Sequence, residues 1–177
     1  MISILDIDKK IKSLEECEKC RDIQIKKFSP LNEVVDFETL NGDYLRCECG
    51  KRPLDIVMSH ILKIMIESEI VPENATLRRN SPVPLSNFYF SSQNPQFIGK
   101  KTLILLHPDF TPEVASQLIE EVPEVECVLK GSPQITAGQE DKNSNINHFE
   151  ILAGDDARTN VMRTLLSDKL IIQKSQS

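Results

Sequence analysis

Glycine is scarce in this chain, with six among 177 residues, and none of the six are clustered. A phosphate-binding loop needs closely spaced glycines between a strand and a helix, so the sequence offers no visible nucleotide cradle. There is also no catalytic Ser-His-Asp arrangement and no His-Glu-x-x-His zinc motif. The sequence therefore names no catalytic residue.

Long hydrophobic runs are lacking as well. The longest apolar stretch, from Leu54 to Ile66, is interrupted by Asp55, His60 and Lys63, which makes it too short and too polar to cross a bilayer. At the N-terminus, Asp6 follows Met1 before the apolar core of a signal peptide could form. We therefore expect a cytoplasmic protein without a membrane partner.

Positive charge is in deficit, because 21 Lys and Arg residues face 27 Asp and Glu residues and leave a net charge of −6. Such a balance argues against indiscriminate binding of polyanions. Residues 46–101 differ, with eight basic and five acidic residues. If RNA is bound, this window is where we expect the contacts. The candidate RNA-binding residues are Lys51, Arg52, Arg78, Arg79, Lys100 and Lys101.

Each of these basic residues could equally be an ordinary solvated surface residue. The neighbouring Phe88, Tyr89 and Phe90 could add a platform on which bases stack. If that segment is a strand, at least one of the three rings must face the core. His60 and Lys63 are expected on the polar side of a helix, without a nucleophile or metal that would make His60 a functional base.

The cysteines are the sharpest chemical signal. Four of the five form two close pairs, and these are Cys17, Cys20, Cys47 and Cys49. Two such pairs can bind zinc tetrahedrally, and Gly50 after the second pair lets the backbone bend around a metal. Four protein ligands leave no open position, so such a zinc would be structural. In the alternative, Cys17 and Cys20 continue the apolar stripe of residues 4–14 and are buried core thiols. Cys127 lies in a strand pattern and is expected in the core.

Apolar periodicity predicts an amphipathic helix from Ile4 to near Cys20, and the Asn41-Gly42-Asp43 turn signal predicts a short strand pair around it. Pro53 begins the clearest helix. Farther along, the patterns predict a buried strand over 102–106, a helix from Thr111 to the Val122-Pro123 break, strands over 125–130 and 149–152, and a final hairpin over 161–174.

These elements predict an α+β fold with three parts. Residues 1–70 form a helical, cysteine-containing N-terminal part with the candidate zinc site. A Pro-rich connector covers residues 71–96, and a small mixed α/β sheet domain covers residues 97–177.

Three segments carry a resemblance to a known family, and they are Ile98-Gly99, Val125–Lys130 and Phe149–Gly154. In this order they resemble the small α+β domain that precedes the catalytic domain of archaeal and eukaryotic tRNA (guanine-N1) methyltransferases. Gly154-Asp155 matches the family's Gly-Glu in kind, and Thr159 is similar in place to its Thr. The resemblance covers residues 97 to about 164.

In that family, the domain packs beside the catalytic domain and helps to position the tRNA without holding the cofactor. The resemblance therefore implies that S-adenosylmethionine acts only through a separate domain or a partner chain. The family's basic loop residue has no clear equivalent here, since residues 139–148 contain only Lys142 as a basic residue.

Two functions follow from these observations. The first is an accessory or substrate-binding domain related to S-adenosylmethionine-dependent tRNA methyltransferases, not catalytic alone, that binds RNA and a protein partner supplying the cofactor domain. The second is a zinc-stabilised protein-interaction module. Fold-level analogy does not choose between them.

Overall fold

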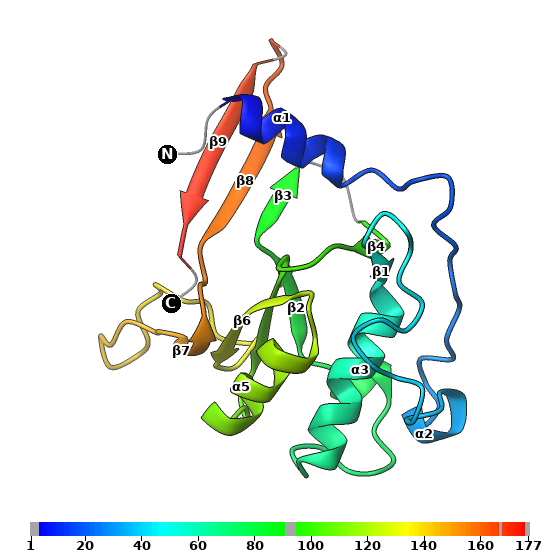
Figure 1. Cartoon of the computed structure of the whole chain (residues 1–177). Coiled ribbons are helices and arrows are strands. Elements are labelled where there is room, and N and C mark those ends of the chain that lie inside the picture. The colour runs from blue at the N-terminus through cyan, green and yellow to red at the C-terminus, as the bar shows by residue number, and fades with distance from the viewer. Residues whose placement is uncertain (1–3, 91–94, 167, 176–177) are drawn as a thin grey trace.

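The computed structural model, which describes residues 4–90, 95–166 and 168–175, is built around a four-stranded sheet (Figure 1). In spatial order its strands are β2 (Val83–Ser86), β5 (Leu103–His107), β6 (Val125–Lys130) and β7 (Glu150–Gly154). The central strands β5 and β6 are parallel, and both outer strands are antiparallel to their neighbours. The α+β fold with a mixed sheet, predicted from the sequence, is confirmed.

Helix α5 (Pro112–Glu121) makes the crossover between β5 and β6. The Thr111 hydroxyl accepts a hydrogen bond from the Val114 amide at 3.4 Å, and Pro112 occupies the first turn. This is the start expected from the sequence, because a Thr cap satisfies one orphan amide and Pro has no amide to satisfy.

The largest core lies where α5 and α3 (Leu54–Glu67) pack on one face of this sheet. Helix α3 begins directly after Pro53, in agreement with the sequence, and nine of its fourteen residues are buried. Leu31 and Val57 from the N-terminal part share this core with Leu105 and Val128. The same core therefore joins residues on both sides of the connector.

His60 belongs to this buried surface of α3 with 2 % of its area exposed, so its predicted position on a polar helix face is wrong. Burial, together with the charges of Arg52 and Lys63, lowers the pKa of His60 to about 4, against the smaller opposing effect of Glu121 and Glu124. The helix buries most of its circumference because α2 (Leu31–Val34), α4 (Leu77–Asn80) and α5 all contact it. His60 is therefore neutral at pH 7.

The opposite face of the sheet has its own cluster of Ile104, Leu106, Cys127 and Leu129. Cys127 is fully buried, which confirms its assignment to the core. Burial raises the pKa of its thiol to about 12.

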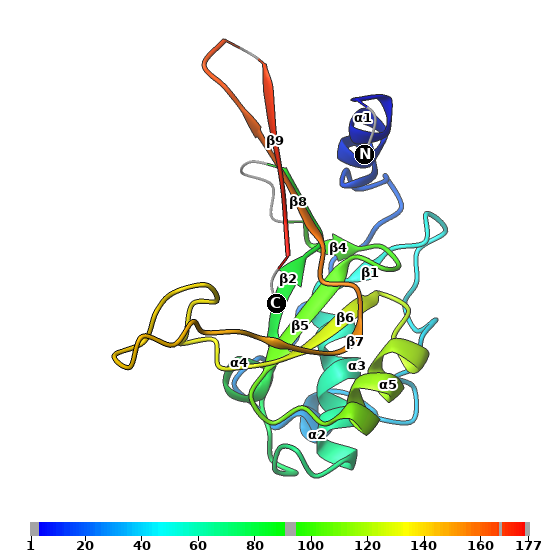
Figure 2. The ribbon, with the colours of Figure 1, turned by 90° about the vertical axis from the view of Figure 1, so that its left-hand side faces the viewer.

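A second sheet of three strands extends from the body of the molecule (Figure 2). It contains β3 (Phe88–Phe90), β8 (Arg158–Arg163) and β9 (Lys169–Lys174), with β3 parallel and β9 antiparallel to β8. The predicted C-terminal hairpin is confirmed as β8–β9. Helix α1 (Ile4–Ser13) covers one face of β3 and β8, because Ile7 packs into a cluster with Phe88, Phe90 and Val161.

The first 51 residues differ from the sequence prediction. Helix α1 ends at Ser13 rather than near Cys20, and the Ser13 hydroxyl donates to the Lys10 carbonyl at 2.6 Å, a local bond that competes with helix continuation. Residues 14–51, all of them described, are mainly turns with α2 as their one helix, and they form no strand pair around Asn41. The Asn41 side chain instead closes a turn by accepting the Asp43 and Tyr44 amides. The helical N-terminal part predicted for residues 1–70 is therefore not confirmed, although α1, α2 and α3 lie within it.

The connector is partly regular, since it supplies α4, β2 and β3; its residues 91–94 lie outside the described residues. A two-stranded pairing of β1 (Arg52–Pro53) with β4 (Phe97–Ile98) fastens its end to the start of α3. Within the described ranges, no helix has the length and apolar character needed to cross a membrane.

Candidate metal centre

The two cysteine pairs meet in space and form what we call the cysteine cluster. Its Sγ–Sγ separations are 3.5 Å for Cys17–Cys20, 3.4 Å for Cys17–Cys47 and 3.6 Å for Cys20–Cys49, and all four sulfurs lie within 4.8 Å of one another. Tetrahedral zinc with Zn–S bonds of about 2.3 Å requires sulfur–sulfur edges of about 3.8 Å. The cluster therefore has the donor set and the spacing to hold a metal ion such as zinc.

The surroundings of these thiols favour the metal interpretation over the core interpretation. Cys17, Cys20 and Cys47 are half-buried and Cys49 is exposed, and the three hydrophobic clusters of the described residues contain none of them. The apolar stripe that includes Ile7 ends at Leu14, just after α1 and before the chain reaches Cys17.

The tight Cys47-x-Cys49 spacing works because the chain reverses directly after it. The Cys47 amide donates to the Lys51 carbonyl at 2.8 Å, and the Gly50 amide donates to the Cys47 carbonyl at 2.8 Å. Gly50 has a φ of +87°, which side-chain-bearing residues rarely adopt. Gly50 thus lets the backbone bend after the second cysteine pair, as expected from the sequence.

The thiols also perturb one another. The hydrogen bond with Cys47 lowers the pKa of Cys17 to about 6, helped by the Lys19 backbone and the Cys20 thiol. Burial raises the pKa of Cys20 to about 12. A divalent cation bound at the centre would favour the thiolate form of all four groups.

A network of ion pairs and hydrogen bonds holds the backbone next to the second cysteine pair, Cys47 and Cys49. Arg46 donates to the Gly50 carbonyl at 2.6 Å and lies 2.8 Å from Glu124. Arg52 makes a two-pronged pair with the same carboxylate, at 2.9 Å and 2.6 Å, and neither Arg52 nor Glu124 is exposed. The prediction that Arg52 binds RNA is therefore wrong, because its guanidinium is enclosed by Glu124 and by the Asn41 carbonyl.

Glu124 is the residue of this network that sequence reasoning missed. It stands just before β6, and only the three-dimensional pairing with residues 46 and 52 distinguishes it from other acids.

Two of the remaining candidate cations lie beside the cysteine cluster. Lys51 and Lys100 line a hollow of about 380 Å³, which we call the lysine hollow. Cys49 and Gly50 form part of its wall, and Ser13, Ser86 and Thr102 contribute hydroxyl groups. The Lys51 ammonium donates to the Glu15 carbonyl, which leaves two of its three protons for another acceptor.

The other candidate cations lie elsewhere. Lys101 is exposed, but its ammonium donates to the Val125 carbonyl at 3.3 Å. Arg78 and Arg79 are exposed on α4, which precedes the Val83 end of β2, whereas Lys100 lies near the Ser86 end. In Figure 2, β4 lies at the top of the body and α4 lies well below it. The six residues therefore do not form one surface.

The segment Phe88–Phe90 is a strand and two of its rings face the core, as expected for a strand, so the three rings do not form a stacking platform. Phe88 and Phe90 are buried under α1, with the Lys10 ammonium 5.5 Å and the Arg163 guanidinium 5.4 Å from the respective ring centres. Tyr89 points to the other face and is half-buried. Of the three rings, only Tyr89 retains an accessible surface.

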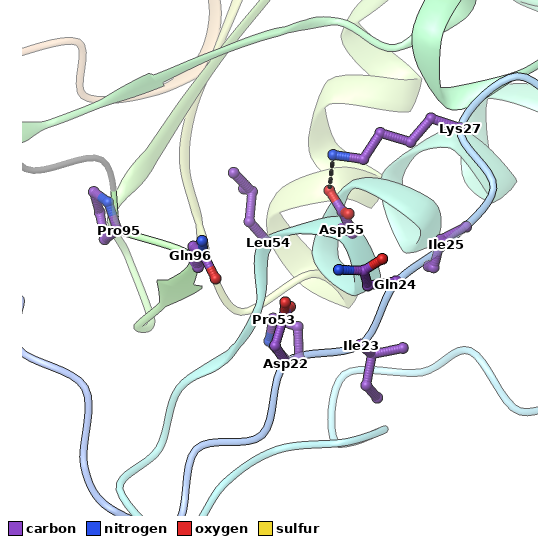
Figure 3. A pocket seen from close by; sticks show the side chains of 10 residues that line it. All are labelled: Asp22, Ile23, Gln24, Ile25, Lys27, Pro53, Leu54, Asp55, Pro95 and Gln96. Atoms are coloured by element: carbon purple, nitrogen blue, oxygen red, sulfur yellow. Dashed lines mark ion pairs between the residues drawn. The ribbon is translucent and has the colours of Figure 1, made fainter.

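A second hollow, of about 480 Å³, lies between residues 22–27 and the start of α3 (Figure 3). Its lining includes Asp22, Gln24 and Gln96, and Lys27 pairs with Asp55 at 2.9 Å across one side. Because these two ionised groups compensate each other, the described lining offers no uncompensated cation to attract an anion.

Comparison with protein-family models, curated proteins and solved structures finds no match to this chain. The resemblance to the tRNA methyltransferase domain stays a prediction. One of its residues has a clear physical requirement: Gly154 has a φ of +84°, and a Cβ there would lie 1.9 Å from the Glu126 carbonyl oxygen.

Proposed function

We propose that this chain is a zinc-stabilised RNA-binding module that helps to position tRNA for an S-adenosylmethionine-dependent methyltransferase and is not catalytic alone. One observation carries the proposal: Lys51 and Lys100 line the lysine hollow, and Cys49 and Gly50 of the second cysteine pair form part of its wall. The resemblance of residues 97–164 to a tRNA-positioning domain supplies the RNA class.

The chemistry of the lysine hollow suits a nucleotide of an unpaired RNA segment. Lysine ammonium groups bind phosphate. The hydroxyls of Ser13, Ser86 and Thr102 each donate their proton to a backbone carbonyl, so toward a ribose or base edge they serve as acceptors. A volume of about 380 Å³ lies within the range of small-ligand sites. Proteins read RNA sequence mostly at splayed-out bases of loops and ends.

Zinc would serve this site by fixing its wall. The two cysteine pairs of the cluster come from segments that are otherwise mainly turns. A metal bound by both pairs would link these segments and hold Lys51 in place. Metal binding in such small centres contributes directly to folding free energy.

A charge-reversal pair with a matched control tests the proposal. The variant Lys51→Glu/Lys100→Glu should weaken tRNA binding and make its salt dependence shallower, by about 0.7–0.9 in log–log slope for each phosphate that the variant no longer binds. The control Arg78→Glu/Arg79→Glu changes the net charge equally at the opposite end of the β2–β5 pair and should bind nearly as the parent does.

Filter binding over a salt series, with circular dichroism to verify folding, gives the comparison. If both variants weaken tRNA binding equally, the loss of binding is due to the change in overall charge and not to the lysine hollow. No tRNA binding by the parent near physiological salt would refute the proposal and favour the protein-interaction module.

The proposal also expects this chain to bind no S-adenosylmethionine, since it has no glycine-rich adenosine loop. Calorimetric titration should show no saturable heat. Micromolar one-site binding would contradict a purely accessory role.

A further inference from the structure

The β8–β9 hairpin exposes an unusual amount of apolar surface. All six residues of β9 are exposed, and the hairpin stands away from the four-stranded sheet (Figure 2). Its exposed apolar residues are Met162, Leu165, Leu166, Leu170, Ile171 and Ile172. At the tip, Leu165 is 105 % and Leu166 is 84 % exposed. Contiguous apolar surface of this kind marks an interaction site in a soluble protein.

Both faces of β9 contribute to this surface. Ile171 pairs with Val161, whose side chain lies under α1, whereas Leu170 pairs with Met162 and therefore lies on the other face. Helix α1 reaches β9 through the ion pair of Asp8 with Lys169, at one end of the strand. The apolar side chains of β9 thus keep part of their area in water on each face, from 38 % for Ile171 to 48 % for Leu170.

The outer edge of β9 is also open. Among the described residues, β9 pairs only with β8 and ends the order β3-β8-β9. An exposed edge strand presents unpaired backbone amides and carbonyls, which are a template for another strand.

Charge decides which strand would fit. Lys169 and Lys174 stand at the two ends of β9, and the ion pair of Lys169 with Asp8 leaves two of the three Lys169 ammonium protons for a further acceptor. In a second copy paired antiparallel about the strand centre, Lys169 would face the other copy's Lys174 twice, and like charges placed opposite each other are destabilising. Self-association in this symmetric register is therefore disfavoured.

We propose that β9 is a docking edge for a strand of another protein, one with an apolar centre and acidic residues at both ends. The partner strand would complete the backbone pairing, place its apolar side chains against Leu170 and Ile172, and set its acids against Lys169 and Lys174. This surface does not include the lysine hollow, so the inference stands independently of RNA binding.

Two synthetic peptides test the proposal with the full chain. The first has alternating Val and Thr flanked by Asp and Glu, and the second has Lys in place of both acids. Fluorescence anisotropy should show binding of the acidic peptide at least tenfold tighter than of the lysine peptide. Hydrogen exchange of the β9 amides should slow only with the acidic peptide.

The variant Leu170→Thr/Ile172→Thr keeps the backbone pairing and the charge of β9 but removes its apolar contact, and it should weaken binding of the acidic peptide at least tenfold. Lys51→Glu/Lys100→Glu should bind it as the parent does. Equal binding of the two peptides, or none of either, would overturn the proposal. A parent dimer that the β9 variant converts to a monomer would assign the edge to a second copy instead.

Discussion

The buried carboxylate of Glu124 gives the most decisive test of how the cysteine-containing segment is held. It is unexposed and pairs with two guanidinium groups, Arg52 at 2.6 Å and Arg46 at 2.8 Å. The substitution Glu124→Gln keeps the size of the side chain and one oxygen acceptor but removes the charge. Both arginines then stay largely enclosed without their counter-ion.

Breaking a buried ion pair by removing one partner typically costs about 3–5 kcal/mol, because the remaining charge is left uncompensated. A domain of this size has a total unfolding free energy of about 5–15 kcal/mol. We therefore expect Glu124→Gln to lose roughly a fifth or more of the free energy of unfolding, with a urea midpoint lowered in proportion and an unchanged slope.

The matched control is Glu67→Gln, which removes an exposed i,i+4 partner 3.9 Å from Lys63. Its expected cost is below about 0.5 kcal/mol. Urea unfolding at pH 7, followed by circular dichroism, measures both variants. If Glu124→Gln loses no more than Glu67→Gln, the network is solvated and the reasoning from its burial is refuted.

Three further outcomes are expected. Protein prepared without chelator should contain one equivalent of zinc by elemental analysis, and Cys47→Ser should lose the metal and stability while Cys127→Ala retains the metal; zinc-free parent protein would refute the metal centre. The folded-state pKa of His60, about 4, lies below the unfolded value of 6.5. As the pH falls, the unfolded chain therefore takes up a proton at this histidine before the folded protein does, and the free energy of unfolding falls by about 2 kcal/mol between pH 7 and pH 5. The variant His60→Leu should make this decline shallower. Unchanged pH dependence in the variant would contradict the assignment. Gly154→Ala should cost at least about 2 kcal/mol because of its positive φ and the clash with the Glu126 carbonyl, whereas Gly99→Ala, with nothing within 4 Å of its Cβ, should be nearly neutral in the same urea assay.

Signals carried by neighbouring residues were readable from the sequence. The Thr111-Pro112 start of α5, the buried run of β5 and the two cysteine pairs each depend on a few adjacent residues whose geometry is fixed by local chemistry. These features were predicted correctly, apart from element ends.

Features that depend on distant partners were not readable. Arg52 looked like a surface cation because its partner Glu124 is 72 residues away. His60 looked polar because the burial of α3 on several sides is set by other helices. The spacing of the six basic residues along the chain likewise gave no information on which end of the sheet each one occupies.

The packing of α1 on the second sheet has a consequence for the order in which the chain assembles during synthesis. Asp8 of α1 pairs with Lys169 of β9, 161 residues farther along. At about 5–20 residues per second, α1 waits roughly 10–30 s for this surface to be made. The last cysteine of the cluster is made long before that, so metal can bind while the Ile7 side of α1 is still uncovered. Protease cleavage of stalled nascent chains would then show a protected cysteine segment beside a cleavable α1, and simultaneous protection of both would contradict this order.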